Sequence, residues 1–236
     1  MSDFKIISKE EYLKKHKKPN QEKVWNKIAK PWKNYVVKKI PVVEEFLRKA
    51  SLSKNNEKAK IVDFGCGTGR NMIPDKKNFY YGIDFSENQI KQAKKYAKEN
   101  NINARLIKTD ITNLKKNFRD KMFDYGLFIA SLHCIEKKEK REKALKEFYR
   151  ILKKNAQALI TVWNSEDERF SHVNNHGDMY MSWKSDGTNY MRYYYLYYKK
   201  EFLDLLKNTG FKILEFYNPR EHDRFSKKNW IVRVRK

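Results

Sequence analysis

Residues 61–69 read Ile61-Val62-Asp63-Phe64-Gly65-Cys66-Gly67-Thr68-Gly69, an apolar strand followed by a turn with glycine at every second position. Glycine adopts positive φ at little cost and carries no Cβ, so this density of glycine indicates close approach of the backbone to a ligand. The G-x-G-x-G spacing differs from the G-x-G-x-x-G that holds a pyrophosphate, and no Gly-Lys-Ser/Thr follows as in a P-loop. The loop therefore points to an adenosine-bearing ligand of another kind.

Two further acidic residues follow predicted strands. Residues 79–84 read as a strand that ends in Asp84, and residues 104–107 read as a strand that leads to Asp110. Because the carboxyl ends of parallel strands meet at one edge of a sheet, we expect Asp84 to bind a pair of ribose hydroxyls and Asp110 an adenine amino group. The stretch from Ser86 to Gln89 fits a capping box that starts a helix. The alternative is that both acids are ordinary turn residues at strand ends.

Together, Asp63-x-Gly65-x-Gly67-x-Gly69, Asp84 and Asp110 resemble the S-adenosylmethionine site of class I methyltransferases. The resemblance implies S-adenosylmethionine as cofactor and a sheet of seven strands in which one of the last two is antiparallel. The cofactor-binding residues that it implies are Asp63, Gly65, Cys66, Gly67, Gly69, Asp84, Phe85, Asp110, Ile111 and Ala130.

The order of the apolar patterns predicts an α/β fold with a single doubly wound, mostly parallel sheet, because strands alternate with helices. Further predicted helices cover residues 24–29, 42–52, 90–96, 137–154 and 199–208, and further strands cover 123–130, 157–163, 211–217 and 230–234. We assign residues 22–236 to one domain. Residues 164–198 are too long for an ordinary connection, so we expect this insertion before the last two strands to cover the active site.

The chain is strongly basic, with 53 Lys and Arg against 29 Asp and Glu and a formal net charge of +24. Such a charge attracts phosphate backbones, and RNA is the expected polyanion. A Lys-rich composition can also arise without any function in binding. Residues 1–60 hold 17 basic and 7 acidic side chains. We expect residues 1–21 to form a basic, polar and mobile arm that contributes to RNA binding.

The sequence contains two cysteines, Cys66 and Cys134, too few for a disulfide framework or a cysteine-rich zinc site. We therefore expect no resident metal. The first residues lack the apolar stretch of a signal peptide, and no window approaches the roughly 20 apolar residues of a membrane span. These features predict a soluble cytoplasmic protein that does not associate with membranes.

A narrower resemblance lies in the last third of the chain. Residues 192–197 (Arg-Tyr-Tyr-Tyr-Leu-Tyr), Met181-Ser182-Trp183 and Asn229-Trp230-Ile231-Val232 look like the closing motifs of the tRNA wobble-uridine carboxymethyl methyltransferases. This family also supplies the methyltransferase domain of AlkB-homologue fusion proteins. The stretches 24–29, 130–133 and 162–164 fit the family as well.

This resemblance implies that the protein esterifies a 5-carboxymethyl group on the wobble uridine of a tRNA. It implies that Arg192 holds the carboxylate or a nearby phosphate, that His133 lies beside the transferred methyl group, and that the base is bound by Trp163, Tyr193, Asn229 and Trp230. It also implies a small zinc-binding activator subunit that shields an apolar sheet edge. Plain structural roles remain open for the tyrosines, for His133 and for the two tryptophans.

The chain departs from the family at two places. Many members carry a Ser-x-Thr-Arg segment where this sequence has residues 33–36 (Lys-Asn-Tyr-Val), so the expected arginine is missing. Members often have paired histidines where this chain has His133-Cys134. Either change would leave carboxylate recognition more dependent on Arg192 or would shift the substrate. Two other functions stay open: a small-molecule methyltransferase with the same cofactor, and a catalytically silent RNA-binding subunit.

Overall fold

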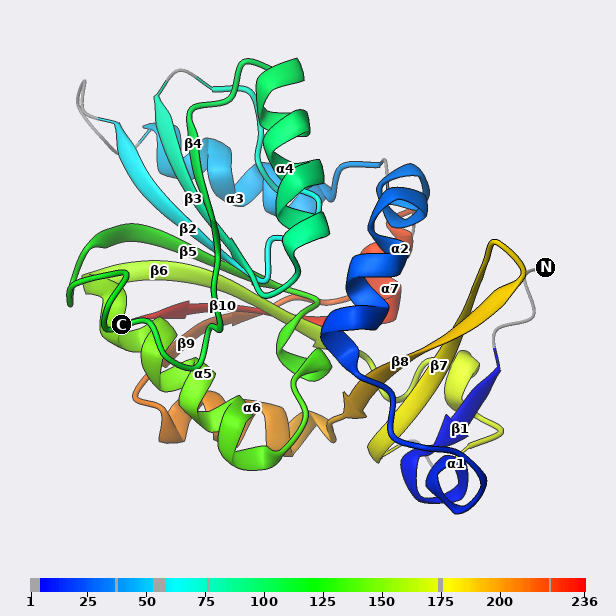
Figure 1. Cartoon of the computed structure of the whole chain (residues 1–236). Coiled ribbons are helices and arrows are strands. Elements are labelled where there is room, and N and C mark those ends of the chain that lie inside the picture. Colours follow the sequence, from blue (N-terminus) through cyan, green and yellow to red (C-terminus); the bar gives the residue numbers. More distant parts are fainter. Residues whose placement is uncertain (1–4, 37, 53–57, 76, 174–175, 221) are drawn as a thin grey trace.

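The computed structural model describes residues 5–36, 38–52, 58–75, 77–173, 176–220 and 222–236. Its main sheet has seven strands in the order β4-β3-β2-β5-β6-β10-β9 (Figure 1). These strands are β2 (Ala59–Phe64), β3 (Asn78–Asp84), β4 (Ala104–Lys108), β5 (Phe123–Ile129), β6 (Leu152–Trp163), β9 (Lys212–Phe216) and β10 (Asn229–Arg235). The first five in this order are parallel, and β10 runs antiparallel to both of its neighbours. The predicted fold is confirmed.

Helices cover both faces of this sheet, with α5 and α6 on one face and α3 and α4 on the other (Figure 1). The main helices are α2 (Gln21–Tyr35), α3 (Pro41–Leu52), α4 (Glu87–Glu99), α5 (Lys138–Ile151), α6 (Lys199–Asn208) and α7 (Arg224–Lys228). Side chains alternate along β2, so Val62 and Phe64 pack on the α5 face while Ile61 packs on the α3 face. Within the described ranges, no helix combines the length and the apolar character that crossing a membrane requires.

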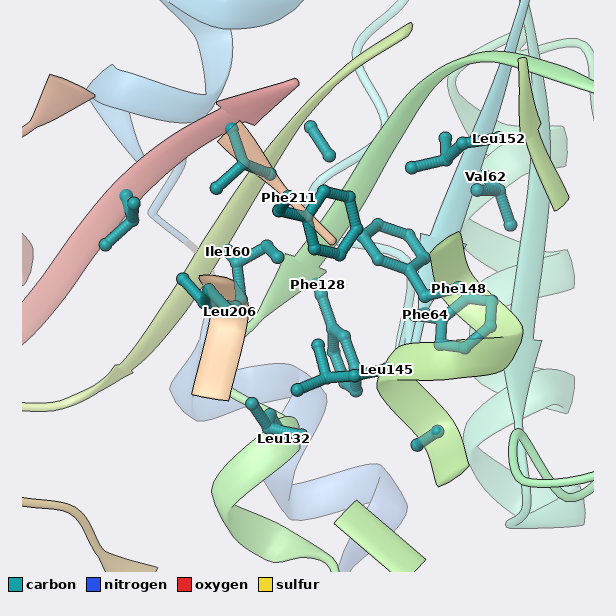
Figure 2. Packing of buried hydrophobic residues seen from close by; sticks show 14 of the residues in the cluster. Val62, Phe64, Phe128, Leu132, Leu145, Phe148, Leu152, Ile160, Leu206 and Phe211 are labelled. Carbon is teal, nitrogen blue, oxygen red and sulfur yellow. The ribbon is translucent and has the colours of Figure 1, made fainter. Parts of the chain in front are cut away.

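The core between the sheet and α5 is aromatic (Figure 2). The ring of Phe148 lies with its centroid 4.8 Å from that of Phe64 and 5.5 Å from that of Phe128. Gly126 on β5 makes this packing possible, because a Cβ at that position would lie 2.5 Å from Cζ of Phe148. The helix is therefore seated directly against the backbone of the central strands.

The segment between β6 and α6 folds as a β-hairpin. Its strands are β7 (Gly177–Ser185) and β8 (Thr188–Leu196), and β1 (Ile6–Ser8) adds to β7 as a third antiparallel strand. Figure 1 shows this small sheet beside the main one, with α2 between it and α4. The insertion predicted over residues 164–198 thus contains a β-hairpin, completed by the N-terminus.

The mobile arm expected over residues 1–21 differs from what the structure shows. Residues 1–4 lie outside the described residues, but β1 is followed at once by helix α1 (Lys9–Lys15). The segment is held by strand pairing with β7 and by the backbone N–H of Lys5, which donates to Ser182 Oγ at 2.8 Å. Non-local pairing of this kind leaves little trace in a short polar sequence.

Two element boundaries also differ from expectation. The helix predicted over residues 24–29 extends to Tyr35, with Pro31 inside it. A proline there removes one backbone hydrogen bond, but Trp32 and Tyr35 beyond it pack on Trp183, with ring centroids 5.2 and 5.0 Å away, and hold the last turn. The helix predicted over residues 137–154 ends at Ile151, because the following residues join β6 and pair with β5 and β10.

Candidate active site

The glycine loop and the acid at the end of β3 meet at the carboxyl edge of the sheet. The buried carboxylate of Asp84 accepts from the backbone N–H of Gly67 at 3.0 Å and from that of Ser86 at 2.8 Å. Burial raises the pKa of Asp84 to about 6, against the lowering effect of these hydrogen bonds. Gly65 has a φ of +67°, and a Cβ there would lie 2.6 Å from Ser131. The loop is therefore built around glycine and oriented by Asp84.

A pocket of about 290 Å³ opens at this edge. Eight of the residues predicted to bind the cofactor line it: Gly65, Cys66, Gly67, Asp84, Phe85, Asp110, Ile111 and Ala130. Asp110 accepts from the backbone N–H of Thr112 at 2.8 Å, which fixes one of its oxygens in a turn. The carboxyl ends of the parallel strands thus bring these residues together as the topology requires.

Asp63 and Gly69 do not line this pocket. The side chain of Asp63 is fully buried behind the loop, where the amide of Asn71 donates to both of its oxygens at 3.3 and 3.2 Å. Burial raises the pKa of Asp63 to about 7. Gly69 instead allows close packing, since a Cβ there would lie 2.6 Å from Cε of Met72. Both residues shape the loop from behind the pocket wall, and a direct contact of either with the cofactor stays a prediction.

Helix α2 supplies a wall of the pocket, and its residues there are not among the predicted site residues. Gln21, Trp25 and Trp32 line the pocket from this helix, and Gln89 lines it from α4. Asn26 fixes α2 against the start of α4, because its Oδ1 accepts from Ser86 Oγ at 2.8 Å and from the backbone N–H of Asn88 at 2.9 Å. In the sequence, Trp25-Asn26 in the helix before the first strand of the main sheet is the signal that could have indicated this wall.

Only half of the predicted capping box forms. Ser86 Oγ accepts from the backbone N–H of Gln89 at 3.2 Å, as an N-cap does. The Gln89 side chain does not return this bond: its amide lies 3.5 Å from the carbonyl oxygen of Trp25, and its buried Oε1 has no partner among the described residues. A Cβ on Gly67 would lie 3.8 Å from this oxygen. The pocket therefore contains an unsatisfied acceptor beside the glycine loop.

Arg192 lies next to the pocket but does not line it. Its guanidinium carbon is 5.2 Å from the ring centroid of Trp32, 5.1 Å from that of Trp183 and 5.4 Å from that of Tyr194. The side chain is buried and donates to the carbonyl oxygen of Ser182 at 3.4 Å, while its Nε has no partner in the described part of the chain. No carboxylate of the described residues pairs with it.

His133 and Trp163 also lie behind the pocket rather than in it. His133 is fully buried, with its ring centroid 5.0 Å from that of Trp163 and 5.6 Å from that of Tyr194. Burial and the nearby charge of Arg169 lower the pKa of His133 to about 3, so the imidazole is neutral. Neither ring nitrogen has a partner among the described residues. His133 therefore does not lie on the pocket surface, and its place beside the methyl group stays a prediction.

The remaining predicted substrate residues are buried elsewhere. The backbone N–H of Tyr193 donates to Gln21 at 2.9 Å. The ring of Tyr193 is fully buried on the hairpin face opposite to that of Arg192, where its hydroxyl donates to Asp178 and accepts from Arg141. Asn229 donates to the carbonyl oxygen of Phe225 at 2.8 Å, and Trp230 belongs to the main core. None of the three lines the pocket in this conformation.

A profile of the family described as "Methyltransferase domain" matches residues 55–210. The chain belongs to this family. With it, the predicted S-adenosylmethionine-dependent methyltransferase class and its cofactor are confirmed.

Curated relatives place the chain near enzymes of tRNA. It is 27% identical over 232 residues to the tRNA (carboxymethyluridine(34)-5-O)-methyltransferase of Schizosaccharomyces pombe, covering 89% of this chain and 92% of that protein. It is 31% identical over 146 residues to the Arabidopsis thaliana protein of the same name, covering 62% of this chain and 33% of that protein. The predicted resemblance to this family is confirmed.

Solved structures show the same fold at low identity. An S-adenosylmethionine-dependent methyltransferase from Clostridium acetobutylicum superposes with a TM-score of 0.66 at 17% identity, covering 89% of this chain and 98% of that one. The 1,6-didemethyltoxoflavin-N1-methyltransferase of Burkholderia thailandensis, solved with S-adenosylhomocysteine, also gives a TM-score of 0.66, at 14% identity over 100% of this chain and 96% of that one.

Proposed function

We propose that this chain transfers the methyl group of S-adenosylmethionine to the 5-carboxymethyl group of the wobble uridine of a tRNA, which gives a methyl ester. The fission yeast relative, whose name states this reaction, aligns over nearly the whole of both chains. The net charge of +24 fits a polyanionic substrate. The proposal makes tRNA the partner and the cytoplasm the place of action.

The pocket has groups that fit the cofactor. Each oxygen of Asp84 already accepts one backbone N–H, which fixes the carboxylate and leaves lone pairs for ribose hydroxyls. The unsatisfied Oε1 of Gln89 requires a donor, and the ammonium group of S-adenosylmethionine has that chemistry. Asp110, Ile111 and Phe85 would hold the adenine. When bound, the cofactor supplies an electrophilic methyl group on a sulfonium.

The acceptor chemistry requires no general base. A carboxylic acid with an ordinary pKa near 4 is already ionised at neutral pH, so its oxygen can attack without loss of a proton. His133 fits this view, because its lowered pKa makes the imidazole a weak base. The task left to the protein is to orient the carboxylate, and positioning alone can supply much of the rate.

The observation that carries the proposal is the buried charge of Arg192, which aromatic rings surround but which no carboxylate of the described residues pairs. An unpaired cation in a protein interior costs several kcal/mol unless an anion offsets it. The indoles of Trp25 and Trp32, at 6.0 and 5.2 Å from the guanidinium carbon, also line the pocket, so the charge lies one side chain behind the pocket wall. A planar guanidinium is well suited to a carboxylate. We therefore assign Arg192 to the acceptor.

The departure near the N-terminus supports the same assignment. In the segment that lacks the family's arginine, Lys33 pairs with Glu99 at 3.3 Å and Val36 is the residue that lines the pocket. Tyr35 packs on Trp183, whose ring in turn lies 5.1 Å from the guanidinium carbon of Arg192. The segment thus offers an apolar wall, and carboxylate recognition rests on Arg192.

The direct test is nucleoside analysis. A tRNA that carries 5-carboxymethyluridine at the wobble position is incubated with the protein and S-adenosylmethionine labelled in the methyl group, digested and analysed by mass spectrometry. We expect a labelled methyl ester of the modified uridine. If the label is found only in free small molecules, the proposed function is wrong and the protein is a small-molecule methyltransferase. S-Adenosylhomocysteine binding without any transfer, also with co-purified partners, would indicate a silent subunit.

The same assay addresses the activator subunit. Strand β4 is an edge of the main sheet, and Ala104, Leu106 and Ile107 on it are only half-buried. A partner that covers this edge is part of the proposal. Ester formation by the isolated chain at the rate of the chain purified from its own cells would show that no activator is needed.

A further inference from the structure

Arg192 and Tyr194 share one face of the hairpin. They are two residues apart on β8, opposite Met181 and Met179 of β7, so their side chains point the same way while Tyr193 between them points the other way. The guanidinium carbon lies 5.4 Å from the Tyr194 ring centroid. This face packs toward Trp25, Cys134 and Trp163 of the main domain.

Tyr194 carries a hydroxyl with no role in the present structure. The residue is 1% exposed, and its Oη has no hydrogen-bond partner among the described residues. Arg192 Nε, also buried, is unsatisfied in the same way. Native proteins pair nearly all buried polar atoms, so two unpartnered donors on one face of the hairpin indicate a binding site.

The chemistry of the Tyr194 hydroxyl is that of a donor. Burial raises the pKa of Tyr194 despite the nearby charge of Arg192, so the hydroxyl stays protonated at neutral pH. The ring itself packs against Trp163, with centroids 3.9 Å apart and an angle of 30° between the ring planes. Loss of the hydroxyl alone therefore leaves the packing of the ring in place.

We propose that the Tyr194 hydroxyl and Arg192 Nε form one carboxylate-binding subsite and that Tyr194 makes it select a carboxylate over a carboxamide. The inference rests on the proposed function, since the carboxylate is that of the acceptor. A carboxylate accepts from both donors. A carboxamide of the same shape has one oxygen and one NH₂ group, so one of the two buried donors would face another donor and stay unpaired. Sites of this kind discriminate strongly between such isosteres.

Entry to the subsite passes through the pocket wall. Cys134 lines the pocket and belongs to the same apolar cluster as Tyr194, and Trp25 lines the pocket while lying 6.0 Å from the Arg192 guanidinium carbon. These side chains stand between the pocket and the two donors. Binding of the acceptor therefore requires the indoles or the hairpin to shift.

The test compares two anticodon stem-loop RNAs that differ in one group. One carries 5-carboxymethyluridine and the other 5-carbamoylmethyluridine at the wobble position, and binding of each is measured with the protein saturated with S-adenosylhomocysteine so that no turnover occurs. For the unaltered protein we expect the acid RNA to bind about 100-fold more tightly than the amide RNA. For Tyr194→Phe we expect this ratio to fall about tenfold, because the acid loses one donor and the NH₂ group of the amide no longer faces one.

A matched control is Tyr197→Phe, which removes another buried hydroxyl from the end of the same segment, in the main core. It should keep the full preference for the acid. If Tyr194→Phe keeps the preference too, the inference is wrong while the proposed function stands. If the unaltered protein binds the acid RNA no better than the same RNA with plain uridine, the proposed function itself fails. Thermal unfolding of each variant shows whether the fold is retained.

Discussion

Lys18 Nζ lies 2.6 Å from Glu136 Oε2, an ion pair that joins the N-terminal segment to the rim of the pocket. Lys9 lies 3.9 Å from the same carboxylate, and the hydroxyl of Tyr180 on β7 donates to it at 3.4 Å. Gln21 continues the connection, since its amide donates to the carbonyl oxygen of Met191 at 3.1 Å. The N-terminal segment thus ties the hairpin to the pocket.

We expect Glu136→Gln to speed the dissociation of S-adenosylhomocysteine up to about fivefold at low salt, because a partly exposed ion pair contributes roughly 0.2–1 kcal/mol. The difference from the unaltered protein should shrink at high salt as the pair is screened. Stopped-flow displacement at two ionic strengths measures this. Glu142→Gln, whose pair with Lys138 at 4.0 Å lies along α5, is the control. Equal rates for all three proteins would show that the pair does not hold the pocket.

We expect Asp84→Ala to weaken S-adenosylhomocysteine binding by about 100-fold or more. The change removes a fixed acceptor for the ligand and leaves the N–H groups of Gly67 and Ser86 without their partner. Isothermal titration calorimetry gives the affinity. Asp110→Ala should cost less, because that side chain is exposed. A larger loss for Asp110→Ala than for Asp84→Ala would contradict the assignment of these two acids.

Gly65→Ala should destabilise the fold more than Gly187→Ala does. Both positions have positive φ, +67° and +72°, which costs an alanine about 1 kcal/mol. At Gly187 nothing lies within 4 Å of the added Cβ, whereas at Gly65 it would meet Ser131 at 2.6 Å. We expect an extra loss of about 1–3 kcal/mol in the free energy of unfolding for Gly65→Ala. Urea unfolding of both variants measures it, and equal losses would argue against a tight loop.

Asp63 predicts a pH dependence of stability. Burial raises its pKa to about 7 from an ordinary value near 4, so the folded protein takes up a proton that the unfolded chain does not hold between these pH values. The free energy of unfolding therefore falls as the pH rises from about 4 to 7, by roughly 4 kcal/mol at most. In Asp63→Asn the free energy of unfolding should fall less over this pH range. The decline that remains is due to Asp84, whose raised pKa of about 6 ends its contribution near pH 6. Urea unfolding across this range would refute the account if both proteins show the same slope.

The sequence predicted well which residues line the pocket at the sheet edge, because these residues are local to strand ends. Asp84 and Asp110 each follow a parallel strand, and the topology alone brings such ends to one edge of the sheet. Helix α6 matched its predicted bounds, since Gly210 ends its apolar pattern. These features depend on short stretches of chain.

The acceptor side could not be predicted in the same way. Which of Arg192, Tyr193 and Tyr194 lie on the hairpin face that packs toward Trp25 and Trp163 depends on the register of the hairpin, and a shift by one residue reverses the answer. The pairing of β1 with β7 and the wall made by Trp25 and Trp32 join segments far apart in the chain. Such contacts follow from packing that no local pattern records.

The central claim is that Arg192 holds the acceptor carboxylate and not the cofactor. Its most direct test is single-turnover methyl transfer to a tRNA carrying 5-carboxymethyluridine, measured for the unaltered protein and for Arg192→Lys, which keeps the charge but loses the planar fork. Both should bind S-adenosylhomocysteine equally, and we expect the variant to form the methyl ester about 100-fold more slowly. An unchanged rate of ester formation, or loss of cofactor binding in a folded variant, would contradict the account.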